Sequence, residues 1–125
     1  LPAWLLIGAV TFWIAGFDLI YACQDTAHDI AEGLHAWPAR FGNASALRAA
    51  KLNHIVFLIL LVLAGWAAGL AWPYYLAAAL TAALLIYEHR LVSPDDLSRV
   101  NVAFFNMNSY IAVTLLAGTL AALLI

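Results

Sequence analysis

The sequence is poor in cysteine and in charge, and each shortage excludes a class of protein. Cys23 is the only cysteine among 125 residues, so no disulfide can form within the chain. Only 10% of the residues are charged, whereas an ordinary soluble domain carries roughly 25%. Five basic residues stand against seven acidic ones, and the formal net charge is −2. We therefore expect no nucleic-acid partner, which would require a basic surface.

What the sequence has instead is long apolar runs. Hydrophobic residues make up 66% of the chain, and they gather in four blocks, at residues 2–23, 55–71, 74–87 and 102–125. Blocks near 20 residues match a hydrocarbon core about 30 Å thick. Backbone groups in hydrocarbon must form their hydrogen bonds internally, so each block should be an α-helix. The predicted fold class is an all-α, polytopic membrane helical bundle with about four transmembrane helices.

The connections between the blocks predict further local structure. Trp72 and Pro73 separate the second and third blocks, which indicates a tight helical hairpin. The third block is short, and snorkelling of residues 88–90 would extend it to the interface. Residues 26–53 should fold as a cap over the helix ends, with a further helical stretch near 44–51. Ser93 and Pro94 resemble the start of a short surface helix over residues 94–100.

The polar chemistry gathers at one face of the membrane. Every lysine and arginine lies in residues 40–51 or 90–99, the first and third connections between the blocks. With four spans, these two connections lie on the same side. The positive-inside rule makes that side cytoplasmic, and it places the acidic residues that follow the first block there too.

Three aspartates follow a first block that carries no charge from residue 1 to residue 15. Asp18, Tyr21, Asp25 and Asp29 are spaced i, i+3, i+7 and i+11, which on one continuous helix confines them to about 80° of arc. Two ionised carboxylates about 6 Å apart repel by roughly 3 kcal/mol at an effective dielectric near 20. No basic side chain stands at helical spacing from Asp18. A divalent cation is the simplest source of compensating charge.

Oxygen ligands alone favour Mg²⁺, which binds through a few carboxylates and bridges to phosphate oxygens. The sequence therefore predicts a site for a phosphorylated ligand. An alternative stays open, in which Asp18 is protonated or paired while Asp25 and Asp29 are solvated. His28 and His35 flank the aspartates, but no closed set of four zinc ligands is visible. His54 and His89 stand at helix ends, where an amphipathic ring at the interface is ordinary.

These residues resemble a known family. The pattern Asp18-x-x-Tyr21-x-x-x-Asp25-x-x-x-Asp29, with Gly33-Leu34-His35 and the segment from Pro38 to Gly42 after it, is similar to the second aspartate-rich motif and following loop of the UbiA superfamily of intramembrane aromatic prenyltransferases. The later stretch YEHRLVSPDDLSRVNVAFFN resembles the 4-hydroxybenzoate polyprenyltransferases of quinone biosynthesis. The likeness covers nearly the whole chain.

The resemblance implies a fold, a reaction and a site. The fold is a bundle of roughly nine transmembrane helices, of which residues 1–125 would form the C-terminal part of a single domain. Two aspartate-rich motifs would hold Mg²⁺ and the diphosphate of a polyprenyl donor, whose allylic group alkylates an aromatic acceptor such as 4-hydroxybenzoate. Asp25 and Asp29 would be catalytic and, with Asp18, metal ligands. Tyr21 and Arg40 would bind substrate.

Only the second of the two aspartate-rich motifs is present, and the opening block lacks the basic region of a signal peptide. We therefore expect the chain to continue before Leu1, or to need a complementary chain, and the isolated 125 residues to be inactive. Transfer to a naphthoate or porphyrin acceptor is an alternative within the class. A non-catalytic four-helix membrane subunit derived from such an enzyme is an alternative outside it.

Overall fold

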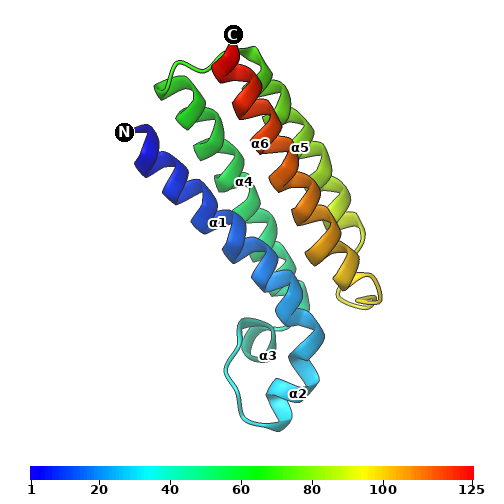
Figure 1. Ribbon diagram of the computed structural model, residues 1–125. Coiled ribbons are helices and arrows are strands. Elements are labelled where there is room, and N and C mark those ends of the chain that lie inside the picture. The colour runs from blue at the N-terminus through cyan, green and yellow to red at the C-terminus, as the bar shows by residue number, and fades with distance from the viewer.

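Four long helices run antiparallel and make up most of the chain (Figure 1). The computed structural model describes all residues from Leu1 to Ile125. The long helices are α1 (Pro2–Ala22), α4 (Asn43–Ala67), α5 (Trp72–Arg90) and α6 (Asn108–Leu124). The shorter elements are the 3₁₀ turn η1 (Cys23–Asp25), α2 (Thr26–Ala31), α3 (Trp37–Phe41) and the π-helical turn η2 (Val102–Met107). There is no β-sheet, so the predicted all-α class is confirmed.

The helices associate as two pairs. α1 packs most extensively on α4, and α5 on α6, while α4 and α5 are joined by a tight hairpin (Figure 1). Gly69 has φ +65° after the end of α4, and Leu70 N–H donates to the Gly65 carbonyl at 3.0 Å. This left-handed glycine satisfies carbonyls that the helix end would leave unpaired. α5 then begins with Pro73 in its first turn, where a missing N–H has no cost.

Small residues allow the helices to approach closely, as is typical of membrane bundles. Gly118 of α6 lies directly against Ala77 and the Pro73 carbonyl of α5. Gly65 of α4 lies under the ring of Tyr74. A side chain at either position would collide with its neighbour, so these contacts determine which faces of the helices meet.

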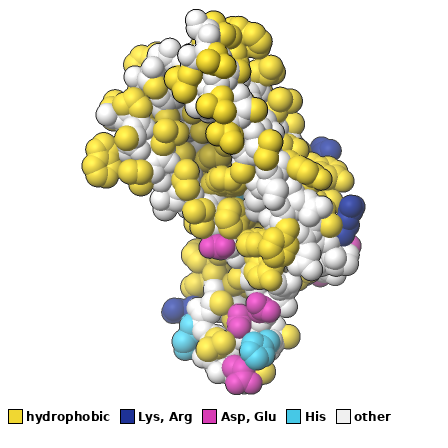
Figure 2. All heavy atoms as spheres, in the orientation of Figure 1, with side chains coloured by type: hydrophobic (Ala, Val, Ile, Leu, Met, Phe, Trp, Pro, Cys, Tyr) yellow, Lys and Arg dark blue, Asp and Glu magenta, His cyan; other side chains and the backbone are white.

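The surface of the bundle is mainly hydrophobic; acidic and histidine side chains gather at the end that carries α2 and α3, and basic side chains also lie along the right edge at mid-height (Figure 2). Three helical runs are long and apolar enough to cross a membrane, Pro2–Ala31, Asn43–Ala67 and Val102–Leu124. α5 is long enough, with 19 residues, but its tyrosines and its polar last turn make it less apolar. The predicted crossing by α5 therefore stays a prediction.

One local prediction is confirmed and one is wrong. The helical stretch expected near residues 44–51 forms, as the first turns of α4, which begins at Asn43 and continues without a break to Ala67. No helix forms over 94–100; instead Ser93 and Asp96 exchange backbone hydrogen bonds of 2.9 and 3.2 Å across a turn. The Asp96 carboxylate accepts hydrogen bonds from the Ser98 hydroxyl and backbone N–H, which hold its pKa below the usual range. These bonds close a turn where the sequence suggested a helix start.

Candidate functional site

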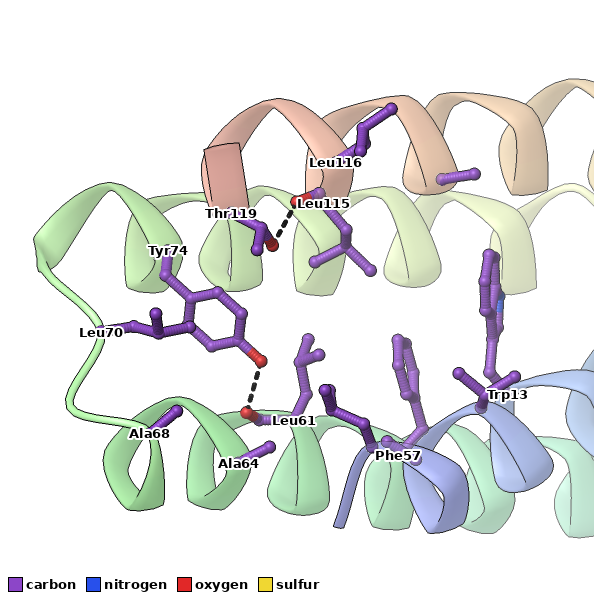
Figure 3. Close-up of a pocket in the computed structure, with 14 residues that line it drawn as sticks. Trp13, Phe57, Leu61, Ala64, Ala68, Leu70, Tyr74, Leu115, Leu116 and Thr119 are labelled. Carbon is purple, nitrogen blue, oxygen red and sulfur yellow. Dashed lines mark hydrogen bonds between the residues drawn. The ribbon is translucent and has the colours of Figure 1, made fainter. Parts of the chain in front are cut away.

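An open apolar groove runs between α1 and α6 over the inner helices. Its first part has a volume of about 350 Å³, and 13 of the 14 residues that line it are hydrophobic (Figure 3). A second part of about 410 Å³ is lined by Phe17, Phe104 and Phe105 among others. Both parts share Val10, Trp13 and Ala112. In Figure 2 the hollow is lined by hydrophobic side chains, and an acidic side chain lies at its lower end.

The polar atoms of the groove wall bond to the protein itself. Tyr74 Oη donates to the Leu61 carbonyl at 2.8 Å, and Thr119 Oγ1 donates to the Leu115 carbonyl at 2.7 Å (Figure 3). Trp13 stacks on Phe57 with ring centroids 5.6 Å apart, and its Nε1 donates to Asn108 Oδ1 at 3.2 Å. Because the donors are satisfied internally, the groove presents a hydrocarbon surface that suits an apolar chain.

The groove ends next to the acidic segment, residues 18–29. Phe17, which lines the groove, directly precedes Asp18. Tyr21 lies one turn further along α1, half-buried, with its ring centroid 4.4 Å from that of Phe104 in η2. The predicted substrate-binding tyrosine is thus held by aromatic packing at the boundary between the groove and the aspartates.

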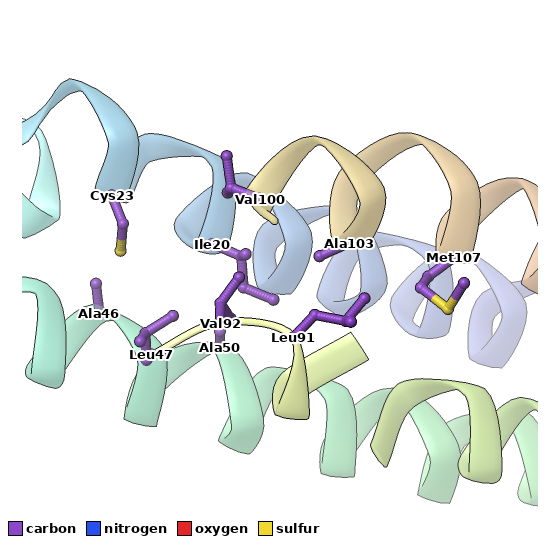
Figure 4. Close-up of a cluster of buried hydrophobic side chains, with 10 residues drawn as sticks. All are labelled: Ile20, Cys23, Ala46, Leu47, Ala50, Leu91, Val92, Val100, Ala103 and Met107. Atoms are coloured by element: carbon purple, nitrogen blue, oxygen red, sulfur yellow. The ribbon is translucent and has the colours of Figure 1, made fainter. Parts of the chain in front are cut away.

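A buried hydrophobic cluster holds the acidic segment against the rest of the bundle. This cluster joins the end of α1 to α4, to the 91–100 connection and to η2 (Figure 4); its members are Ile20, Cys23, Ala46, Leu47, Ala50, Leu91, Val92, Val100, Ala103 and Met107. Thr26 Oγ1 also donates to Asn43 Oδ1 at 2.6 Å and so ties α2 to the start of α4. Cys23 therefore has the packing role expected of it.

The aspartates do not lie on one continuous helix. η1 interrupts the helix between Asp18 and Asp29, and each 3₁₀ residue advances by about 120° instead of about 100°. Three such residues rotate α2 by roughly 60° relative to α1. Asp18 and Asp25 are exposed, whereas Asp29 is only 9% exposed.

No basic side chain neutralises these carboxylates. The only carboxylate within ion-pairing distance of a basic side chain is Glu88, far along the chain. Arg40 is exposed in α3, and its guanidinium carbon lies 5.2 Å from the centroid of the Phe41 ring. α3, which carries Arg40, contacts η1 and α2, which carry Asp25 and Asp29.

The donors fit Mg²⁺ in their chemistry, because they are exclusively carboxylate oxygens. They are not drawn into one compact group of three within the chain. The roles of Asp18, Asp25 and Asp29 as metal ligands, and of Tyr21 and Arg40 in substrate binding, stay predictions.

A second polar cluster escaped the sequence reasoning. His54, Glu88 and His89 bring their ligand atoms within 4.8 Å of one another, and Glu88 is fully buried, so it does not snorkel as expected. A signal was present in the hairpin: His54 lies 13 residues before the end of α4 at Ala67, and Glu88 lies 16 residues after the start of α5 at Trp72. Offsets that differ by less than one helical turn place the two residues at a similar level of an antiparallel pair.

Comparison with known proteins gives a consistent result. Residues 1–110 match the UbiA prenyltransferase family. The chain is 32% identical to 4-hydroxybenzoate octaprenyltransferase from Nitrosospira multiformis over 94% of its residues, and 32% identical to the protein of that name from Cupriavidus necator over 96%. It is 31% identical over 94% of its residues to the protein of that name from Salmonella paratyphi B. The chain spans 40–41% of the length of these relatives. No solved structure matches it.

Proposed function

Because this chain belongs to the UbiA prenyltransferase family, we propose that it forms the C-terminal part of an enzyme that transfers a polyprenyl group from its diphosphate to an aromatic acceptor such as 4-hydroxybenzoate. Three long apolar helices and the family make the chain part of an integral membrane protein. The observation that carries the proposal is the junction of an apolar groove with an acidic segment that has no basic partner.

The two parts of this junction suit the two ends of a polyprenyl diphosphate. The groove receives the isoprenoid chain, and its hydrocarbon wall excludes water that would otherwise trap an allylic cation. Asp25 and Asp29, assisted by Asp18, hold Mg²⁺, which when bound neutralises the departing diphosphate. Tyr21 orients the donor at the boundary, and the exposed guanidinium of Arg40 binds diphosphate oxygens.

A further segment of protein, either preceding Leu1 or on a complementary chain, supplies the other aspartate-rich motif. The basic residues lie in α3, in the first turns of α4, at the last residue of α5 and in the connection that follows it, all toward the ends of the helices nearest the acidic segment; they are Arg40, Arg48, Lys51, Arg90 and Arg99. By the positive-inside rule this end faces the cytoplasm, where a water-soluble diphosphate group is accessible to it.

The test is a transfer assay with the full-length protein in membranes, a polyprenyl diphosphate and 4-hydroxybenzoate. We expect prenylated product with Mg²⁺, loss of product with EDTA, and recovery when Mg²⁺ is restored. Parallel assays with a naphthoate acceptor decide between acceptor classes. Absence of product with every acceptor, from a protein shown to be folded and to contain the first aspartate-rich motif, would refute the proposal.

The proposed role of the groove in binding the isoprenoid chain leads to a second prediction. Ala112→Trp places an indole where both parts of the groove meet, and should lower transfer from a long polyprenyl donor by roughly tenfold. Displacing about two buried methylenes costs roughly 1.5 kcal/mol, which is about tenfold in affinity. The matched control is Ala83→Trp on the exposed face of α5, outside the groove. A short donor of two isoprene units, geranyl diphosphate, should be affected less, and equal losses for both donors would contradict the assignment.

A further inference from the structure

The buried cluster of His54, Glu88 and His89 lies between α4 and α5 and takes no part in the proposed transfer site. His54 Nδ1 is 2.8 Å from His89 Nε2 and 3.8 Å from Glu88 Oε2. His54 is 2% exposed and Glu88 is 0% exposed. Three atoms that can each bind a metal ion therefore converge in a place that the bundle encloses.

The cluster is electrostatically incomplete. Neither oxygen of Glu88 has a hydrogen-bond partner, and His89 Nδ1 has none either. Burying a carboxylate without a donor or a countercharge costs several kcal/mol. No lysine or arginine pairs with Glu88, so the chain itself does not supply the missing charge.

The orientation of His54 identifies which nitrogen is available. His54 Nε2 lies 3.3 Å from the Trp13 carbonyl, and because a carbonyl only accepts, Nε2 must be the nitrogen that carries hydrogen. Nδ1 of the neutral ring then has a free lone pair, directed toward His89 and Glu88. Metal-binding histidines commonly donate their other N–H to a backbone carbonyl in this way.

The backbone is shaped around this histidine. A side chain at Gly16 would collide with the His54 ring, so the glycine lets α1 approach and present the Trp13 carbonyl. A hydrogen bond between the two histidines accounts for His54 and one nitrogen of His89, but it leaves both Glu88 oxygens unsatisfied.

We propose that His54, Glu88 and His89 bind one Zn²⁺ ion, at a site separate from the carboxylate Mg²⁺ site. Tetrahedral zinc with bonds of about 2.0–2.1 Å holds neighbouring ligand atoms about 3.3 Å apart. The two separations that involve His54, 2.8 and 3.8 Å, lie on either side of that value. The ligand atoms of His89 and Glu88 lie within 4.8 Å of each other, so movements of up to about 1.5 Å complete the tetrahedral spacing. Two imidazoles with one carboxylate suit zinc better than magnesium.

An approach to the site exists from the polar end of the bundle. A groove of about 470 Å³ between α4 and α5 is lined by His54 and His89 and by the cations Lys51 and Arg90. The ion reaches its ligands through this groove, and a water or an anion attracted by the two cations takes the fourth coordination position. Zinc there would bind α4 to α5 and hold α1 through the Trp13 carbonyl, which is a stabilising role.

The experiment uses full-length protein in detergent, stripped with a chelator, incubated with Zn²⁺, and desalted before metal analysis. We expect about one more zinc per chain in the unaltered protein than in Glu88→Gln or His54→Gln, whose affinity should fall by at least 10–100-fold, the range seen even for weaker outer partners. His35→Gln, an exposed histidine of the capping loop, is the matched control and should retain zinc.

X-ray absorption on the zinc-loaded unaltered protein tests the ligands without any substitution. Scattering from two imidazoles supports the site. Purely carboxylate coordination, or equal zinc contents in the unaltered protein and folded Glu88→Gln, overturns it. Asp29→Asn should keep its zinc, so loss of transfer activity and loss of this metal are separable results.

Discussion

Asparagine at position 25 or 29 is expected to slow Mg²⁺-dependent transfer by the full-length enzyme roughly a hundredfold or more. A metal ion supplies several kcal/mol of charge stabilisation in such a transition state, and about 1.4 kcal/mol corresponds to a factor of ten in rate. Asparagine keeps the size of the side chain but lacks the negative charge that holds the ion. The measurement is kcat/KM for the diphosphate donor across a range of Mg²⁺ concentrations.

We expect these substitutions to lower activity without lowering thermal stability. Asp25 is exposed and has no ion-pair partner in the chain, so Asp25→Asn removes repulsion and should leave thermal stability in detergent equal or slightly higher. Asp95→Asn, an exposed acid outside the acidic segment, is the matched control and should retain activity. Undiminished transfer in both Asp25→Asn and Asp29→Asn would contradict the assigned metal site.

Gly118→Ala is expected to destabilise the bundle by about 1–3 kcal/mol, the usual cost of overpacking. The added methyl group would meet Ala77 and the Pro73 carbonyl, and a carbonyl in the first turn of α5 cannot move without moving the helix. The fall in stability is measured as the midpoint of thermal unfolding in detergent.

The same substitution at Gly8 is the control. There the nearest atom to an added methyl is the flexible Leu60 Cδ1, at 3.2 Å, so the side chain can adjust. Alanine exceeds glycine in helix propensity by up to about 1 kcal/mol, and Gly8→Ala should therefore be neutral or stabilising. Equal effects at the two positions would show that intrinsic propensity, and not the α5–α6 contact, determines the response.

Much of the fold was predictable from local patterns. The first block was expected to end near Cys23, and α1 ends at Ala22; the hairpin at Pro73 was also expected. The error in helix placement concerns a place where tertiary contacts decide between local alternatives. Ser93 and Pro94 suit a helix start, yet pairing of Ser93 with Asp96 closes a turn there. Residues 44–51 join α4 because their buried side chains, such as Ala46 and Ala50, pack on the end of α1.

The aspartate site, too, was predictable only in part. Spacing identified the residues, but the 3₁₀ turn η1 changed their relative directions, and nothing in the spacing reveals that turn. The groove was not predictable either, because apolar residues look alike in sequence whether they face lipid, a neighbouring helix or a ligand.

The sequence by itself determined that this protein is helical, resides in a membrane, and concentrates its charge at one end, because hydropathy and charge are properties of consecutive residues. The tertiary structure alone decided that Asp29 is buried while Asp18 is exposed, that the groove ends beside Tyr21, and that Glu88 is buried against His54. Those outcomes depend on how each helix is rotated about its axis and on the axial register in which it packs against its neighbour. A change of a few residues in register would place Glu88 in a different environment without altering any local pattern.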